Sequence, residues 1–313
     1  MDRLSAIGRF ATAPPRSAEP DMSARVLPAV LAAAAVLTQI SYPLLTGTAL
    51  RTATIAAVLL FAASSLTDAG RRFGIAAAAG VLLVAGGVGL VAEAVGVGTG
   101  VPFGSYSYSG TLGPALLGVP LLVPVAWTMM AYPCLLLGRR LARRRTPRLG
   151  TRRPDTTRRT VTVLAGAGTL AGWDLYLDPQ MVAAGHWTWS TPHPALPGIP
   201  QVPLTNYAGW LLVAAVMIAL LDRTVPDRPV LDRAVPDPPV TGLRRAPGGA
   251  ATELVPAALL AWTWIGSAVG NLVFFGRPAA AAYGAVAMGV CTLPYLMAVV
   301  RDLPARRDTA AAS

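Results

Sequence analysis

The chain has 313 residues, of which 54% are hydrophobic and only 13% are charged. Soluble domains carry about 25% charged residues, and here the apolar residues fall in long blocks, so the composition favours a membrane protein. The net charge of +11 does not indicate a nucleic-acid-binding protein. All 26 basic residues are arginines in the segments between apolar blocks, which leaves no basic face for a phosphate backbone.

Eight apolar blocks, one of them short, predict membrane-crossing helices, since roughly 20 residues cross a hydrocarbon core of about 30 Å. We expect these helices at 26–46, 52–67, 73–96, 114–138, 160–182, 203–221, 252–275 and 279–300. The predicted fold is therefore all-α, a polytopic membrane helix bundle of about eight transmembrane helices.

The polar segments divide the chain into five parts. Residues 1–25 are expected to form a disordered tail, 26–221 a six-helix membrane core that carries the site, and 252–300 the last two membrane helices. The segment 222–251 is rich in Pro, Asp and Arg, and we expect a flexible linker there, because proline disfavours regular structure. Residues 301–313 are expected to form a second tail.

The arginines predict the orientation in the cell membrane. With both termini in the cytoplasm, only Arg51 and Arg277 of the 26 arginines lie outside, as the positive-inside rule requires. Asp68 and Glu253 then lie at cytoplasmic helix ends, where we expect them to be solvated. The arginine-rich segment 139–159 is expected to anchor the protein on anionic lipid.

An internal repeat relates the third and fourth helices to the fifth and sixth. YSYS at 106–109 matches WTWS at 187–190 with an offset of 81 residues, and the same offset places Glu93 on Asp174. After a one-residue deletion the matches continue as Pro114-Ala115-Leu116 with Pro194-Ala195-Leu196 and Gly118-Val119-Pro120 with Gly198-Ile199-Pro200. We predict parallel repeats related by an axis along the membrane normal, with a site at their interface.

Three carboxylates, Glu93, Asp174 and Asp178, lie in the outer part of their membrane blocks. An ionisable group in a membrane helix is costly and usually faces the bundle interior or a wet cavity, so a functional role is the default expectation. The alternative is a residue that only caps a helix. It is strongest for Asp178, because Asp178-Pro179 is a good start for a short following helix.

Asp174 and Asp178 are four residues apart and would share one helix face. Carboxylates crowded in a low-dielectric site cannot all ionise, so we expect at least one to stay protonated beside an ionised partner. Such a set suits general acid–base catalysis. We expect the repeat-related acids Glu93 and Asp174 to face a shared cavity and to be essential, and Asp178 to matter less.

Aromatic side chains accompany these acids along the chain: Tyr106, Tyr108, Trp173, Trp187 and Trp189. They predict either an aromatic belt at the headgroup level or, with Asn206, a substrate-binding cavity whose π-faces stabilise a carbocation. Asn206 and Asn271 lie at outer helix ends, where an amide could orient a water. His186 and His193 share a loop without a ligand spacing and are weak evidence for a metal site.

Three stretches carry a resemblance to the carotenoid-biosynthesis membrane proteins of the CruF type. They are VPFGSYSYSGTLGPALLGVPLLVPVAW (101–127), GWDLYLDPQMVAAGHWTW (172–189) and GIPQVPLTNYAGWLL (198–212). The resemblance covers roughly residues 26–300. The family it points to includes carotenoid 1,2-hydratases and bisanhydrobacterioruberin hydratases.

The resemblance implies an enzyme that adds water across a terminal double bond of a linear carotenoid with forty or fifty carbons. Protonation of the alkene gives a tertiary cation, which water then attacks. The implied partners are a carotenoid in the bilayer, membrane lipid and other enzymes of the pathway. The resemblance implies neither a metal nor a redox cofactor.

Two other readings remain open from the residues. A membrane prenyltransferase would hold Mg²⁺ with Asp-rich motifs, whereas D-x-x-x-D occurs once here and the acids lie opposite the Arg-rich loops. A transporter of a lipophilic or small solute could use the parallel repeats for alternating access.

Overall fold

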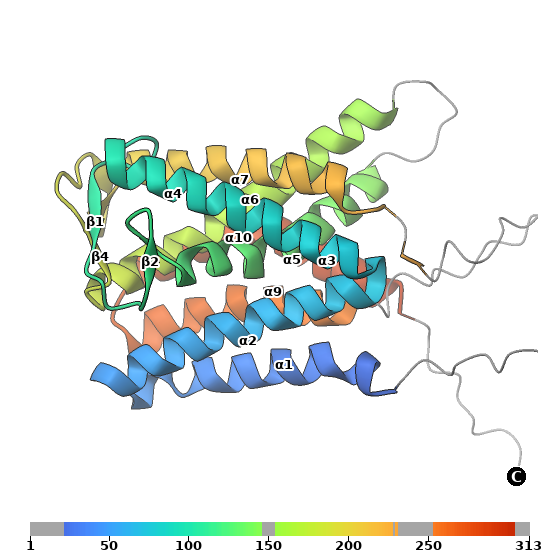
Figure 1. Ribbon diagram of the computed structural model, residues 1–313, viewed down its shortest axis with the longest axis horizontal. Helices are drawn as coiled ribbons and strands as arrows, with labels where there is room; N and C mark the ends of the chain where they lie inside the picture. Colours follow the sequence, from blue (N-terminus) through green and yellow to red (C-terminus); the bar gives the residue numbers. More distant parts are fainter. Residues whose placement is uncertain (1–21, 146–153, 228, 231–252, 304–313) are drawn as a thin grey trace, which may run out of the picture.

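The computed structural model describes residues 22–145, 154–227, 229–230 and 253–303. Long helices run side by side along the molecule, and strands β1, β2 and β4 lie together at one end, on the left in Figure 1. In the described part of the chain, seven segments are long and apolar enough to cross a membrane. This is the composition of a multi-pass membrane protein.

The helical elements follow the predicted order. They are α1 (Met22–Ile40), η1 (Tyr42–Leu44), α2 (Gly47–Phe73), α3 (Ile75–Val81), η2 (Leu82–Gly86), α4 (Gly87–Thr99), α5 (Leu122–Arg145), α6 (Pro154–Ala183), α7 (Leu204–Thr224), α9 (Leu254–Val269), η4 (Gly270–Phe274) and α10 (Pro278–Arg301). The elements η2 and η4 are π-helical turns that continue the neighbouring helices, so α3, η2 and α4 form one rod.

Helix α6 is also long, which brings the long helices of the described residues to eight. It is not among the seven apolar segments. Its membrane-length stretch contains Asp174 and Asp178, which lower its hydropathy. The number of long helices in the described residues thus agrees with the prediction, while one helix carries the polar groups of a site.

Six short strands correct the prediction of a purely helical chain. Antiparallel pairs join β1 (Tyr106–Tyr108) to β4 (Trp187–Trp189), β2 (Ala115–Leu116) to β3 (Val119–Pro120), and β5 (Ala195–Leu196) to β6 (Ile199–Pro203).

Several predicted helix boundaries are wrong, and two helices show this most clearly. The helix expected from residue 114 begins only at Leu122. The residues before it form the β2–β3 hairpin, whose turn places Leu117 and Gly118 in the left-handed region with φ of 53° and 79°. The short helix expected at 52–67 is α2, which is 27 residues long.

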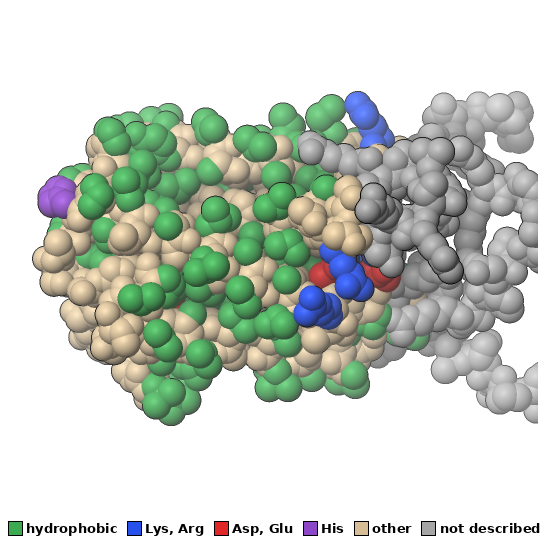
Figure 2. Space-filling model, turned by 90° about the horizontal axis from the view of Figure 1, so that it is seen from above, with side chains coloured by type: hydrophobic (Ala, Val, Ile, Leu, Met, Phe, Trp, Pro, Cys, Tyr) green, Lys and Arg blue, Asp and Glu red, His purple; other side chains and the backbone are tan. Residues whose placement is uncertain are grey.

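Helix α5 lies at the centre of the bundle. About four fifths of its span, 78%, is buried inside the protein, against 22–44% for the other six apolar segments. The outer helices therefore present apolar side chains outward; Leu83 and Val290, for example, are 73% and 69% exposed. On the face seen in Figure 2, the described charged side chains gather near one end. Such a surface suits a lipid environment.

The acidic residues Asp68 and Glu253 are buried and ion-paired, so the prediction that they are solvated is wrong. Asp68 accepts hydrogen bonds from Arg71 at 2.8 Å and from the Tyr132 hydroxyl at 2.7 Å. Glu253 accepts one from Arg140 at 3.0 Å. The arginines supply the opposite charge that burial of a carboxylate requires.

Arg139 is also buried, which corrects the expectation that the whole segment 139–159 anchors the protein on lipid. Its guanidinium donates to Asp222 Oδ1 at 2.7 Å and to the carbonyls of Asp222, Val225 and Pro226. These carbonyls lie at or just beyond the C-terminal end of α7, where a cation is favourable. The start of the predicted linker is thus held in place; residues 231–252, like 1–21 and 304–313, lie outside the described part.

Candidate active site

Glu93 lies in α4 and is only 5% exposed. Its Oε2 accepts hydrogen bonds from the hydroxyls of Tyr106 at 2.5 Å and Tyr108 at 2.7 Å. Its Oε1 accepts a third from the indole Nε1 of Trp127 in α5, at 3.1 Å. Three donors on one carboxylate offset the cost of its burial.

The β1–β4 ribbon brings four aromatic rings to one face, because alternate residues of a strand point the same way. Tyr106 lies opposite Trp189 and Tyr108 opposite Trp187, with ring centroids 5.7 Å apart in both pairs. Burial, together with the neighbouring Glu93, raises the pKa of both tyrosines. Both phenols therefore stay protonated near neutral pH and donate hydrogen bonds to Glu93.

Asp174 and Asp178 lie one turn apart in α6, and both are buried. The Nδ2 of Asn206, in α7, donates to Asp174 Oδ2 at 2.8 Å and also to Asp178 Oδ2. Trp187 Nε1 donates to Asp178 Oδ1 at 3.1 Å. Asn206 thus bridges two buried carboxyl groups, and two carboxylates crowded in one low-dielectric site cannot both ionise.

The interpretation of Asp178 as a helix cap is wrong. Helix α6 continues through Pro179 to Ala183, so no new helix begins there. A proline inside a membrane helix is tolerated because neighbouring groups satisfy the freed backbone. Asp178 instead accepts side-chain hydrogen bonds from Trp187 and Asn206.

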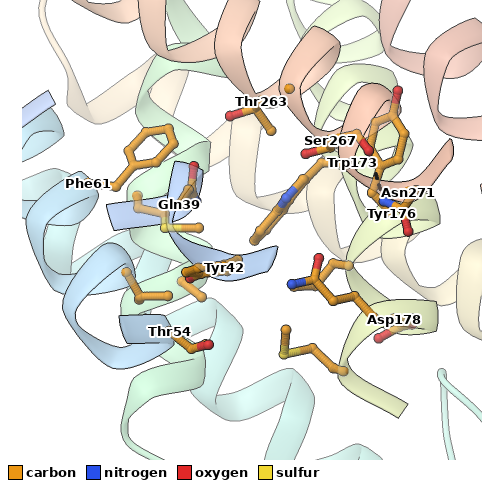
Figure 3. A pocket seen from close by; sticks show the side chains of 18 of the residues that line it. Gln39, Tyr42, Thr54, Phe61, Trp173, Tyr176, Asp178, Thr263, Ser267 and Asn271 are labelled. Atoms are coloured by element: carbon orange, nitrogen blue, oxygen red, sulfur yellow. Dashed lines mark hydrogen bonds between the residues drawn. The ribbon is translucent and has the colours of Figure 1, made fainter. Parts of the chain in front are cut away.

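A cavity of about 880 Å³ lies beside these carboxyl groups. Glu93, Asp178 and Asn206 line it, whereas Asp174 is not among the lining residues, contrary to the expectation that it faces the cavity with Glu93. Figure 3 shows Asp178 and Trp173 among the side chains around this space. Six tryptophans line it: Trp127, Trp173, Trp187, Trp189, Trp210 and Trp262. Its lining is therefore rich in aromatic rings and also contains the carboxyl groups of Glu93 and Asp178.

All five aromatic residues singled out in the sequence line this cavity: Tyr106, Tyr108, Trp173, Trp187 and Trp189. Trp189 also has a structural contact, because its Nε1 donates to the Phe103 carbonyl at 2.9 Å. His186 lies outside the cavity lining and pairs with Thr111 through Nδ1 at 2.8 Å. Over the described residues, no group of three or more His, Cys, Asp or Glu is placed to hold a metal ion.

Trp127 and Trp210 were not predicted as site residues. Their rings stack with centroids 3.8 Å apart, and Trp173 meets Trp210 edge to face at 5.9 Å. The repeat contained one signal for Trp127, since the offset of 80 after the deletion pairs it with another aromatic residue, Tyr207.

Residues 46–243 match the family model described as carotenoid biosynthesis protein, which is well over half of the chain. The chain belongs to this family. A bisanhydrobacterioruberin hydratase from Haloarcula japonica is 40% identical over 131 residues, which is 42% of this chain and 40% of that relative. This chain is thus matched to less than half of that relative's length. No solved structure matches the chain. The resemblance seen in the sequence is confirmed at the level of the family.

Proposed function

We propose that this protein hydrates a terminal carbon–carbon double bond of a linear carotenoid. The observation that carries the proposal is the placement of Glu93 and Asp178 on one aromatic-walled cavity, in a chain of a carotenoid biosynthesis family. The relative named as a hydratase supports the reaction class. A bilayer-resident substrate also suits an enzyme made of apolar helices.

Asp178 is the proton donor in this proposal. It faces the cavity, and Asn206 Nδ2 bridges it to the equally buried Asp174, an arrangement that favours one shared proton on the pair. Transfer of that proton to the less substituted carbon of the terminal double bond breaks the π-bond and leaves a tertiary cation on the other carbon. A strong enough acid is needed because an alkene is a poor base.

Glu93 and the indoles act on the cation that follows. The stacked rings of Trp127 and Trp210 line the cavity, and the face of an indole attracts a cation within about 6 Å. Water adds to the cation and gives up a proton, which Glu93 accepts before the proton returns to the aspartate pair. The net reaction is alkene plus water to tertiary alcohol.

We propose further that α4–α5 and α6–α7, with their hairpins, are copies related by an axis along the membrane normal. The β1–β4 ribbon supports this, because its end contacts obey the 81-residue offset: Ser109 N donates to the His186 carbonyl and Ser190 N to the Ser105 carbonyl, both at 2.9 Å. The two bonds lie on either side of the paired residues Ser107 and Thr188.

The orientation belongs to the same proposal. We place the strand-bearing end of the bundle outside the cell and both termini in the cytoplasm, as the arginine distribution indicates. The candidate site then lies near the outer face of the membrane.

Expression in a lycopene-producing bacterial host tests the function. Mass analysis of the pigments should show products heavier than lycopene by one or two molecules of water. A double variant, Glu93→Gln with Asp178→Asn, is the matched control and should yield unmodified lycopene. Unmodified pigment in cells that contain the wild-type protein in their membranes would contradict the proposal for this substrate.

A further inference from the structure

The cavity has a second wall that lies outside the family match. Gln39 in α1, Tyr42 in η1, Ser267 in α9 and Asn271 in η4 line it, whereas the match covers residues 46–243 (Figure 3). Helices α1 and α9 are joined at this wall, because Trp262 Nε1 donates to Gln39 Oε1 at 2.6 Å. A hydrogen bond between two helices therefore holds this second wall together.

Asn271 carries a buried amide oxygen without a hydrogen-bond partner among the described residues. The residue is 1% exposed, and its Nδ2 donates to the Ser267 carbonyl at 2.9 Å. Its Oδ1 is buried and accepts no hydrogen bond from any described residue. An unpaired buried amide oxygen destabilises a fold, and Asn271 is among the residues that line the cavity, so a bound group that donates a hydrogen bond to Oδ1 would remove this cost.

We propose that Asn271 Oδ1 binds an O–H group in the reaction cavity, first as the incoming water and then as the new hydroxyl of the product. The inference rests on the proposed hydration, in which these are the same oxygen atom. A water in a largely apolar cavity needs polar partners to be held in place. Asn271 supplies one acceptor for it, on the wall outside the family match.

The amide oxygen orients the water and takes no proton from it. The water oxygen forms a bond to the tertiary cation carbon while one of its hydrogens stays bonded to Asn271 Oδ1. The other proton leaves to a carboxylate of the acid cluster. The net reaction is still alkene plus water to tertiary alcohol, so atoms and charge balance. Asn271 only positions the water.

Asn271→Leu tests this inference, because it keeps the approximate size and removes the acceptor. The reconstituted full-length protein is given lycopene in lipid vesicles. We expect kcat to fall about tenfold, the equivalent of one neutral hydrogen bond, with KM unchanged. Asn271→Asp, which retains the acceptor oxygen, should keep more activity than the leucine variant.

Thr292→Val is the matched control. Thr292 Oγ1 in α10 is likewise buried without a partner among the described residues, but it does not line the cavity. Loss of this hydroxyl group should leave kcat unchanged. Both variants should melt in detergent at similar temperatures, since each removes a buried unpaired oxygen.

A second substrate separates the two sources of the O–H group. If the group is a hydroxyl already present on the carotenoid, Asn271→Leu raises KM for a monohydroxylated lycopene and leaves lycopene turnover intact. Equal kinetics of Asn271→Leu and Thr292→Val on both substrates would overturn the inference, as would a loss that merely follows a lower melting temperature. Absence of hydration by the wild-type protein would instead remove the proposed function.

Discussion

At the scale of single residues, Asp178 and Asp174 act together in the proposed proton transfer to the alkene. Asp178 lines the cavity, whereas Asp174 does not, and Asn206 Nδ2 donates a hydrogen bond to both carboxyl groups. We expect Asp178→Asn to lower turnover by about 10²–10⁴-fold, the usual range for general acid–base catalysis. Asp174→Asn should cost nearly as much, and the double variant little more, because the pair acts as a unit.

The measurement is hydrated pigment formed per amount of protein in the membrane. Asn preserves the shape of each side chain, so both variants should accumulate at normal levels. Near wild-type pigment from both single variants would contradict the assignment of these acids.

Gly89 makes room for Trp127, which donates to Glu93. A Cβ atom at Gly89 would lie 2.7 Å from Cδ1 of the buried Trp127 ring, so the ring must move and take its N–H with it. We expect Gly89→Ala to lower turnover about 10²-fold, the cost of a displacement of about 1 Å near reacting groups. Gly87→Ala, on the same helix with nothing within 4 Å of its Cβ, is the control. Equal turnover of the two alanine variants would argue against a positioning role for Trp127.

The sequence predicted a good part of this site because the acids and aromatic pairs recur at one offset. It did not predict Trp127, because an indole inside an apolar helix is compatible with simple packing and its partner, Glu93, lies in another helix. It also ranked Asp174 above Asp178. The repeat gives the position of a residue along a helix, whereas the side chain that reaches the cavity depends on how the helices are rotated against each other.

At the scale of elements, the buried guanidinium of Arg139 fastens α5 to the end of α7. The side chain is 1% exposed and its partner Asp222 is 8% exposed. Arg139→Leu leaves that carboxylate buried without its cation, and we expect a loss of about 3–5 kcal/mol of stability. Arg144→Leu is the matched control, because Arg144 is 37% exposed and surface pairs contribute about 0–1 kcal/mol.

Thermal melting of the detergent-solubilised protein, followed by helical circular dichroism, compares the two variants. Arg139→Leu should melt well below the wild-type protein and Arg144→Leu close to it. Equal melting temperatures would show that the buried pair does not hold these helices together.

Hydropathy predicted which segments form helices but misplaced several of their ends. Residues 114–120 are apolar, and prolines occur in membrane helices, so nothing in the composition separated the β2–β3 hairpin from α5. The left-handed Leu117 and Gly118 explain the turn once it is seen. Hydropathy also missed the burial of Asp68, because its arginine and tyrosine partners pair with it only in the folded bundle.

At the scale of the whole molecule, the arginines predict the orientation in the membrane. A reporter enzyme that is active only in the cytoplasm should be active when fused after residue 240 or at the C-terminus. The same reporter fused within the loop between α4 and α5, after residue 111, should be inactive. The reverse pattern would place the carboxyl cluster near the cytoplasmic face and contradict the orientation.

The arrangement of the helices around the cavity could not be predicted from the sequence. Helices α1 and α9 are far apart along the chain, yet both line the same space as α4 and α6. Hydropathy identifies a membrane helix without identifying its neighbours, and the repeat relates only the middle four helices. The second wall of the cavity therefore emerged only from the structure.

The most direct test of the account is the origin of the oxygen in the product. The purified protein, reconstituted in vesicles with lycopene, is incubated without dioxygen in water labelled with heavy oxygen. Hydration predicts a tertiary alcohol that carries the heavy isotope, formed without any added oxidant and lost in Asp178→Asn. A product that needs dioxygen and takes its oxygen from it, or a wild-type protein that leaves lycopene unchanged, would contradict hydration by this cavity.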